Sequence, residues 1–337
     1  TITTESTADL PALTYVTGNV DLNGVDGKAN ITAGKLLTID GNMTLTGLTG
    51  GISLPTLGSV GNVRITEVAG KATVTSIDFS GMTSGKVETG TESLVLAGAT
   101  SVKLGGELPS HVNLAKCVEF VHGGAVAQPA LDLTLGGANA TLSIAATSFT
   151  GEVTITTKGN INLPSVTKIV KTNLIAGTAA SEAHLPALKE VAGDLDISAK
   201  FTTIDLTLLE TLKGHLNIHG VISVSLPALA KLTTSVVTIT CPVATTFSAP
   251  KLDTGHTSGC LIDLKAAVDH ISLLNLADVV TPTNDVAEFA AIKKITLAAQ
   301  KGDLDVSGAT ALVDLEFTGF KNSPTGEDAQ LNTLTIT

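Results

Sequence analysis

The sequence predicts an all-β fold, a parallel β-solenoid, and three observations support this prediction. Hydrophobic residues make up 43% of the 337 residues, whereas charged residues make up 15% and aromatic residues 3%. Short segments alternate apolar and polar residues, as β-strands with one buried face do. The same segments recur roughly every 20–23 residues, and self-similarity at such a period is the signature of a repeat architecture.

The clearest repeats begin with Leu-Pro-Ala-Leu and lead through a glycine into a strand. Leu10–Leu22 and Leu185–Ile197 share this pattern, with apolar residues, proline and glycine at the same positions. Weaker copies begin at Leu54, Leu163, Leu206, Leu226 and Ala249. A second apolar pair midway through each period predicts two short strands per coil. A unit of this size cannot bury its own apolar face, so we expect the coils to stack on one another.

We expect a single solenoid domain over 1–337, with clear repeats in 10–65 and 163–264 and an irregular part in 66–162. One segment, about 283–294, departs from the strand pattern. It has Asp and Glu early, Lys late and apolar residues at helical spacing. That arrangement complements a helix dipole and predicts a short helical insertion.

The repeated Leu-Pro-x-Leu, followed by a glycine and an alternating strand, resembles the leucine-rich-repeat-like and receptor-L-domain-like surface proteins. The likeness is nearest to their threonine-rich cell-wall or bacterial surface types. It covers Leu10–Ile65 and Leu163–Leu264 well and the middle of the chain poorly. The resemblance implies a right-handed coil, an extracellular or cell-surface location and a role without catalysis. It also implies cell-wall or surface glycans as partners.

The charge balance argues against two classes of partner. Lys and Arg number 20 and Asp and Glu number 31, so the net charge is −11. Nucleic-acid binding needs a basic face that displaces counterions from phosphates, and we expect none here. The most apolar stretch, Leu261–Val280, is interrupted by Asp, Lys and His residues. We therefore expect no membrane span.

Catalytic, cofactor and metal motifs are also missing from the sequence, so we predict no enzyme activity, no cofactor and no metal site. The nearest approach to a metal pattern is His215 and His219, which the alternation places on the outward face of one strand. They stand too far apart to chelate one ion. One coil earlier, Asp194 and Asp196 occupy the positions of His215 and Asn217. We interpret these residues as polar ladders on the surface, with a weak cation site as the alternative.

Cysteine and asparagine residues suggest covalent modifications. Cys241 and Cys260 are separated by nearly one repeat, which would allow a disulfide between adjacent coils. The alternative is that they and Cys117 are small buried hydrophobic residues. Asparagines followed by a residue and then threonine are N-glycosylation acceptors in exported proteins. They are Asn30, Asn42 and Asn139.

The two ends of the sequence both have the character of strands, and uncovered strand edges pair with other chains. We therefore expect Ile2, Thr3, Leu334 and Ile336 to mediate head-to-tail assembly, a contact that builds filaments when it does not close. The predicted function is an extracellular structural protein, a subunit of a surface filament or wall layer. The alternative is a monomeric adhesin or receptor-like binding module. A minor alternative is an ice-binding protein, because threonine pairs such as Thr44 and Thr46 recur on strands.

Overall fold

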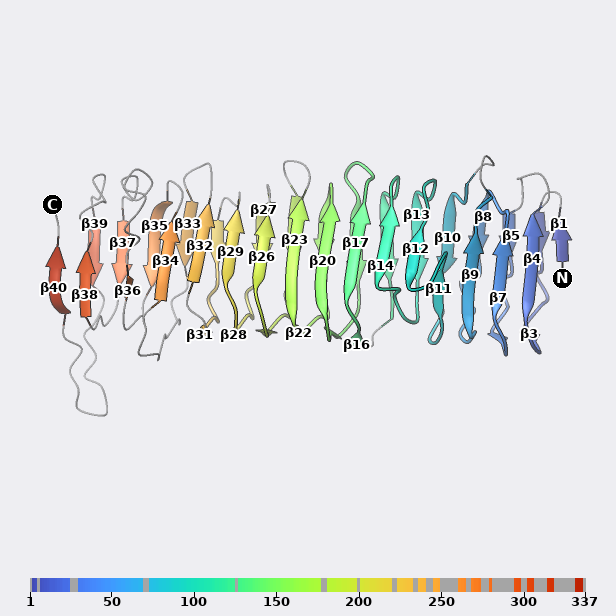
Figure 1. Ribbon diagram of the computed structural model, residues 1–337, viewed down its shortest axis with the longest axis horizontal. Coiled ribbons are helices and arrows are strands. Elements are labelled where there is room, and N and C mark those ends of the chain that lie inside the picture. The colour runs from blue at the N-terminus through green and yellow to red at the C-terminus, as the bar shows by residue number, and fades with distance from the viewer. Residues whose placement is uncertain are drawn as a thin grey trace. The chain divides into compact units, whose positions relative to one another are not determined.

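The computed structural model describes most of the N-terminal two thirds of the chain and isolated strands beyond it. The described backbone comprises 2–4, 7–24, 30–68, 73–124, 127–176, 181–198, 201–219, 223–232, 236–240, 245–248, 260–264, 268–273, 279–280, 294–297, 302–305, 314–317 and 331–335. Side chains are described in 8–24, 30–68, 73–124, 127–175, 181–198, 201–218 and 225–230. Every described element is a β-strand (Figure 1).

The chain divides into two compact units, Thr1–Val166 and Thr167–Thr337. In the first unit, one sheet contains β1 (Ile2–Thr4), β4 (Val20–Gly24), β7 (Met43–Thr46), β9 (Asn62–Thr66) and β11 (Lys86–Glu88). A second contains β2 (Thr7–Asp9), β5 (Asn30–Thr32), β8 (Gly51–Ser53), β10 (Ser76–Phe79), β13 (Ser101–Leu104), β15 (Glu119–His122), β18 (Thr141–Ile144) and β21 (Asn160–Asn162). A third contains β12 (Ser93–Val95), β14 (His111–Leu114), β17 (Leu131–Leu135) and β20 (Glu152–Thr157). Two-residue strands form small sheets, β3 (Tyr15–Val16) with β6 (Thr38–Ile39) and β16 (Ala127–Gln128) with β19 (Ser148–Phe149).

The second unit repeats this arrangement. One sheet contains β23 (Lys171–Ala176), β26 (Leu195–Ser198), β29 (Leu216–His219), β32 (Val236–Thr240), β34 (Cys260–Leu264) and β36 (Val279–Val280). Next to it in each coil are β24 (Ser181–His184) with β27 (Phe201–Asp205), and β30 (Ser223–Ser225), β33 (Thr245–Ser248), β35 (Val268–Leu273), β37 (Lys294–Leu297) and β39 (Asp314–Phe317). The two-residue strands are β22 (Lys168–Ile169), β25 (Glu190–Val191), β28 (Thr211–Leu212) and β31 (Lys231–Leu232). The last pair is β38 (Gly302–Asp305) with β40 (Leu331–Thr335).

Parallel pairing in register confirms the predicted β-solenoid. Each strand pairs with the strand of the same face one coil away, about 21 residues along the chain. The inward residues therefore stack into columns. One column in the first unit consists of Ile31, Ile52, Ile77, Val102, Phe120, Leu142 and Ile161. All of these side chains are buried. Full burial of such a side chain contributes about 1.5–3 kcal/mol, so each coil adds to a continuous aliphatic core.

The structure adds details that the sequence pattern did not predict. Most coils carry a third strand of only two residues, besides the two strands that were expected. Residues that pair in register between neighbouring described strands are separated by 18 residues at Ser93 and His111 and by 30 at Asp303 and Thr333, a wider range than the 20–23 predicted. The predicted helix at 283–294 lies outside the described residues except for Lys294, which begins β37. The handedness and the single-domain assignment stay predictions.

A side-chain oxygen from one coil connects to the backbone of the next at the start of several strands. Asn19 Oδ1 accepts a hydrogen bond from the Asn42 N–H at 2.9 Å, and Asn42 Oδ1 accepts one from the Asn62 N–H at 2.8 Å. In the second unit, Asp194 Oδ1 accepts one from the His215 N–H at 2.8 Å. We call this contact the Asx–Gly lock, because the receiving residue always follows a glycine.

The glycine of each lock is required by space. A Cβ on Gly41 would collide with Asn19 Oδ1, and one on Gly61 would collide with Asn42 Oδ1. Gly214 stands in the same relation to Asp194. The glycines at positions 41, 61 and 214, which the sequence shows without explaining, therefore leave the space that receives the side-chain oxygen of the preceding coil.

The predicted irregular part of the chain contains a break between two sheets. β11 pairs with β9 on the side of the earlier coils, whereas β12 pairs with β14 on the side of the later ones. Between them the chain makes a tight turn in which the Thr89 N–H donates to the Ser93 carbonyl at 2.7 Å. Glu92 adopts a φ of 53° in this turn, and its carboxylate lies 2.6 Å from Lys86 Nζ. The strand is thus split into β11, which pairs with β9, and β12, which pairs with β14, and a single parallel bridge joins Lys86 of β11 to Glu107 of the later coil.

The Asx–Gly lock predicts a large difference between two glycine substitutions. Gly61→Ala should lower the free energy of unfolding by about 1–3 kcal/mol, because the new methyl group overpacks the recess that holds Asn42 Oδ1. Gly34→Ala is the matched control, since a Cβ there meets no atom within 4 Å. It should change stability by no more than about 0.5 kcal/mol. Urea unfolding of both variants measures this, and equal effects would contradict the lock.

Candidate functional site

The described coil nearest the N-terminus leaves its apolar interior partly open. Its inward residues Leu10, Leu13, Val16 and Val20 are all half-buried. The residues at the same register positions one coil later are Ala33, Leu36, Ile39 and Met43, and all of them are buried. The side chains of the two coils differ in exposure because of their position in the stack, since an inner coil is covered by neighbouring coils on both sides.

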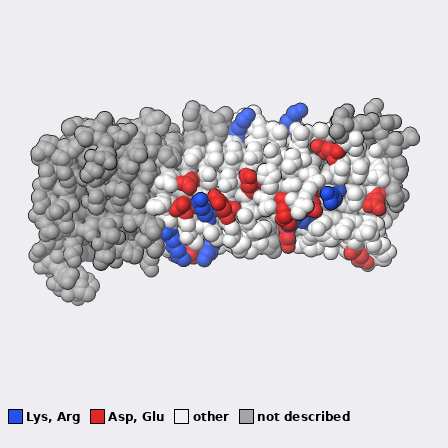
Figure 2. Space-filling model, in the orientation of Figure 1, with Lys and Arg blue, Asp and Glu red and all other residues white. Residues whose placement is uncertain are grey.

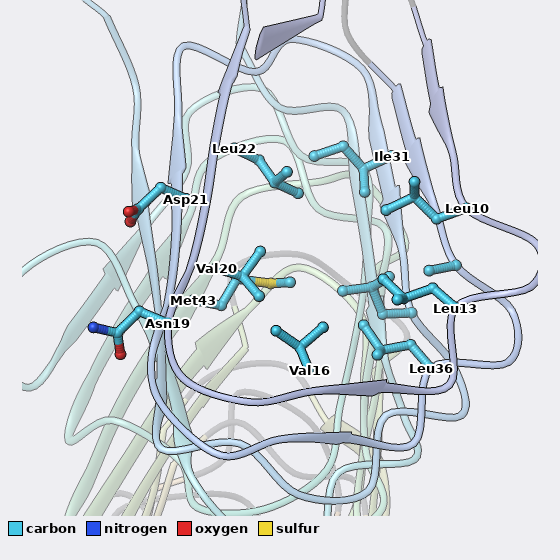
Figure 3. Close-up of a pocket in the computed structure, with 12 residues that line it drawn as sticks. Leu10, Leu13, Val16, Asn19, Val20, Asp21, Leu22, Ile31, Leu36 and Met43 are labelled. Atoms are coloured by element: carbon cyan, nitrogen blue, oxygen red, sulfur yellow. The ribbon is translucent and has the colours of Figure 1, made fainter. Parts of the chain in front are cut away.

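These residues surround a pocket of about 260 Å³. Figure 3 shows Val16, Val20, Leu22 and Met43 on one side of the hollow and Leu10, Leu13, Ile31 and Leu36 on the other. Asn19 and Asp21 also border the pocket, but their side chains point away from it on the outer side of β4. The hollow therefore suits apolar side chains and offers no charged group to a ligand.

Local sequence explains the shape of this pocket. The Leu10–Leu13 segment forms a turn in which the Leu13 N–H donates to the Leu10 carbonyl at 3.2 Å. The same bond recurs between Leu54 and Leu57 and between Leu185 and Leu188, so the Leu-Pro-x-Leu repeat is the corner of the coil. Proline suits the second position of such a turn, and both leucines point inward. Within the described strands, β2 and β3 each pair on one side only.

The structure places some of the predicted assembly residues beside this pocket. Ile2 and Thr3 lie in β1, where Ile2 pairs with Leu22 and Thr3 with Asn23. In the described sheets β1 has β4 as its neighbour on one side only. Leu334 lies in β40 and pairs with Leu304, whereas Ile336 lies outside the described residues. Their role in assembly stays a prediction.

The polar ladder predicted around His215 is present. Asp196 pairs with Asn217, and the Asn217 amide donates a hydrogen bond to Asp196 Oδ1 at 2.5 Å. Asp194 contacts the His215 backbone through the Asx–Gly lock and not through the imidazole. Among the residues that the structure describes, no group of three or more His, Cys, Asp or Glu residues is placed to hold a metal ion.

A row of Ser93, His111 and Asp132 crosses three neighbouring strands in register. His111 Nδ1 lies 3.0 Å from Asp132 Oδ2, and both side chains are about half exposed. A catalytic triad also requires a hydrogen bond between the serine hydroxyl and the histidine. No such bond joins Ser93 and His111 in the described part of the chain. The row is a surface ladder with one His–Asp pair.

The sequence-predicted modification sites lie in different surroundings. Asn30 and Asn42 use their amide oxygens to accept N–H groups of the next coil, at 2.7 and 2.8 Å. Asn139 is exposed and has a φ of 53°. Cys260 begins β34, Cys241 lies outside the described residues, and their disulfide stays a prediction. Burial raises the pKa of the Cys117 thiol to about 11, so at neutral pH this cysteine is an unreactive core residue.

The threonine pairs do not form a continuous array on the described sheets. Thr44 lies between Asp21 and Arg64 in the register of its sheet. Thr154 likewise neighbours Asp132. Figure 2 shows acidic and basic side chains interspersed on the visible face of the described residues. These surfaces are mixed polar ladders.

The core contains a polar side chain, that of His122, which the sequence pattern did not predict. His122 is 1% exposed and occupies an inward position between Leu104 and Ile144. Its Nε2 donates to the Gly106 carbonyl at 3.0 Å, and no described residue contacts its Nδ1 by a hydrogen bond. Gln128, also buried, accepts the Leu108 N–H at 2.9 Å. The alternation predicts that residue 122 points inward, but one sequence does not distinguish a buried histidine from an exposed one.

No family model, curated protein or solved structure matches this chain. Among its described residues, none belongs to a helix with the length and apolar character that crossing a membrane would require. The resemblance to leucine-rich-repeat-like surface proteins stays a prediction.

The buried His122 predicts loss of stability in mild acid. Burial lowers the pKa of His122 from its ordinary 6.5, because the charged imidazole is poorly solvated there. The unfolded chain therefore binds the proton more readily than the folded one, so stability falls as pH drops below about 6.5. His122→Leu should reduce this loss between pH 6.5 and 5, in thermal unfolding followed by circular dichroism.

The exposed His215 provides the control. His215→Asn should leave the pH dependence of unfolding as it is in the unmodified protein. If His122→Leu and His215→Asn shift the curve by the same amount, the buried imidazole is not the group responsible.

Proposed function

We propose that the protein is an extracellular structural protein whose copies stack end to end into a surface filament or wall layer. One observation carries this proposal, the half-buried apolar interior of the coil that contains Leu10, Leu13, Val16 and Val20. Identical register positions are fully covered wherever another coil lies on both sides. A further coil stacked on this face would cover these four residues in the same way.

A second copy of the chain is the occupant that the repeat favours. Within the described stacks, each coil presents apolar columns and strand edges that fit the next coil, so the chain is complementary to itself along its repeat direction. Contact between the first-coil face of one copy and a later coil of another uses two different surfaces. Such a heterologous contact propagates as a filament when it does not close into a ring.

The magnitudes indicate that apolar contact alone is too weak for this association. Completing the burial of four half-buried side chains contributes on the order of 3–6 kcal/mol. Immobilising one copy against another costs about 4–15 kcal/mol. Hydrogen bonds along the strand edges of β2 and β3 must supply the remainder, as they do in recognition by strand addition. We therefore expect assembly to depend steeply on protein concentration.

The extracellular setting is supported by the surface and by the sequence resemblance. The outward positions carry threonine, asparagine, serine and scattered charges of both signs, which suit an exposed repeat protein in contact with surface glycans. A monomeric adhesin or receptor-like module has the same kind of surface. Self-association distinguishes the two functions.

The test measures assembly of the whole chain across a concentration series by electron microscopy and sedimentation velocity. We expect single particles at low concentration and filaments above a threshold. Val16→Lys should raise that threshold at least about tenfold, because a second copy would bury the new charge.

Leu208→Lys is the matched control, since Leu208 is an exposed leucine at 45% accessibility in the second unit. It should leave the threshold unchanged. Thermal unfolding checks that both variants fold. A protein that stays monomeric at every concentration would overturn the proposal and favour the monomeric adhesin.

A further inference from the structure

One stretch of the chain, 106–108, is held to its two neighbouring coils by different kinds of hydrogen bond. Toward the earlier coil, the Gly106 and Glu107 N–H groups donate to backbone carbonyl groups, at 2.7 and 3.0 Å. Toward the later coil, no described backbone group bonds to the Gly106 carbonyl or to the Leu108 N–H. Side chains of the later coil take the place of the backbone there.

His122 and Gln128 supply these side-chain contacts. His122 Nε2 donates to the Gly106 carbonyl at 3.0 Å, and Gln128 Oε1 accepts the Leu108 N–H at 2.9 Å. Both side chains are 1% exposed. A Cβ on Gly124 would lie 2.7 Å from the imidazole ring and 2.5 Å from the Gly106 oxygen, so only glycine leaves room for the contact. We call the two hydrogen bonds the side-chain clasp.

The clasp leaves one nitrogen of His122 without a partner. Its Nδ1 is buried, and no described residue bonds to it. In the neutral ring Nδ1 carries only a lone pair, whereas protonation adds an N–H donor and a positive charge. His122 stands between Leu104 and Ile144 in register, and these apolar side chains offer that donor no acceptor. Because a buried, unpaired charge is costly, the closed clasp requires the neutral imidazole.

The charged side chains on the surrounding elements do not compensate such a charge. Lys103 of β13 and Glu119 of β15 form an ion pair with each other at 3.1 Å on the outer face, and Glu107 is exposed. Cys117 is buried in the same core, but burial raises its pKa to about 11, so its thiol is neutral. The inward residues of β14, β16, β17 and β18 are all uncharged. No described ion pair includes His122.

We infer that the side-chain clasp is an acid-sensitive joint, in which protonation of His122 releases 106–108 from the following coil while the other contacts between coils persist. The release is local, because each coil of a solenoid contacts only its neighbours and proteins open in separate units. It therefore differs from the loss of global stability derived above. The inference does not depend on end-to-end assembly.

The direction of the pH effect follows from burial. The pKa of His122 is lowered from its ordinary 6.5 while the clasp is closed, and it returns toward that value once the ring reaches water. The open form therefore binds the proton more readily than the closed form. The clasp is fully closed above pH 6.5 and is progressively lost as the pH falls below it.

The experiment measures hydrogen exchange of single backbone amides in the whole chain, corrected for the intrinsic effect of pH on exchange. The Leu108 amide should exchange about tenfold faster at about pH 5.5 than at about pH 7.5, the shift expected when only the open form is protonated. The reference is the Lys189 amide of the second unit, which donates to the Thr167 carbonyl at 2.9 Å. It should change by less than about twofold. Equal changes at the two amides would mean global unfolding and would overturn the inference.

Two substitutions test whether His122 is the group that titrates. His122→Gln keeps an N–H for the Gly106 carbonyl but has no group that is protonated in this range, so the Leu108 amide should exchange alike at both pH values. His215→Gln removes an exposed imidazole and should keep the full acid response. A full acid response in His122→Gln would also overturn the inference. The comparison of Leu108 with Lys189 in the unmodified protein needs no variant, so it tests the joint even where a substitution prevents folding.

Discussion

In-register parallel stacking is the constraint on which the rest of this structure depends. Each strand obtains its backbone partners from the coils on either side, so every coil must present its N–H and C=O groups at the same height. Inward side chains then stand directly over one another, as Ile31, Ile52 and Ile77 do. The aliphatic columns and the low aromatic content both follow, since stacked residues of similar size pack without gaps.

Stacking also explains why asparagine and glycine recur at the start of several strands. An asparagine at the start of a strand connects to the next coil through its side-chain oxygen, and glycine is the residue that leaves room for it. The contact lies on the surface, where one hydrogen bond contributes about 1 kcal/mol. Its repetition, more than its individual strength, makes it a device for alignment. Glycine and asparagine therefore act as one element of the repeat.

Several departures from regularity lie between β11 and β16, and register shifts occur in three later strand pairs. The strand divides at the turn that contains Glu92, and the coils in this part vary in length. The buried polar residues His122 and Gln128 lie a coil or two further on, where apolar residues would continue the columns. A solenoid tolerates such changes because each coil contacts only its neighbours, so a local irregularity does not disturb distant coils.

The sequence by itself determined the solenoid and the average length of its coils, because both follow from local periodicity. It also placed Asp196 opposite Asn217, since a constant repeat implies the register. Only the tertiary structure decided that Asn42 Oδ1 fills the recess at Gly61, that His122 is buried and that one strand is split. These features depend on contacts between residues 16 to 25 positions apart, across coils of unequal length. The open face at Val16 and Val20 has the same origin, because burial depends on which coil lies next to a residue and not on the residue itself.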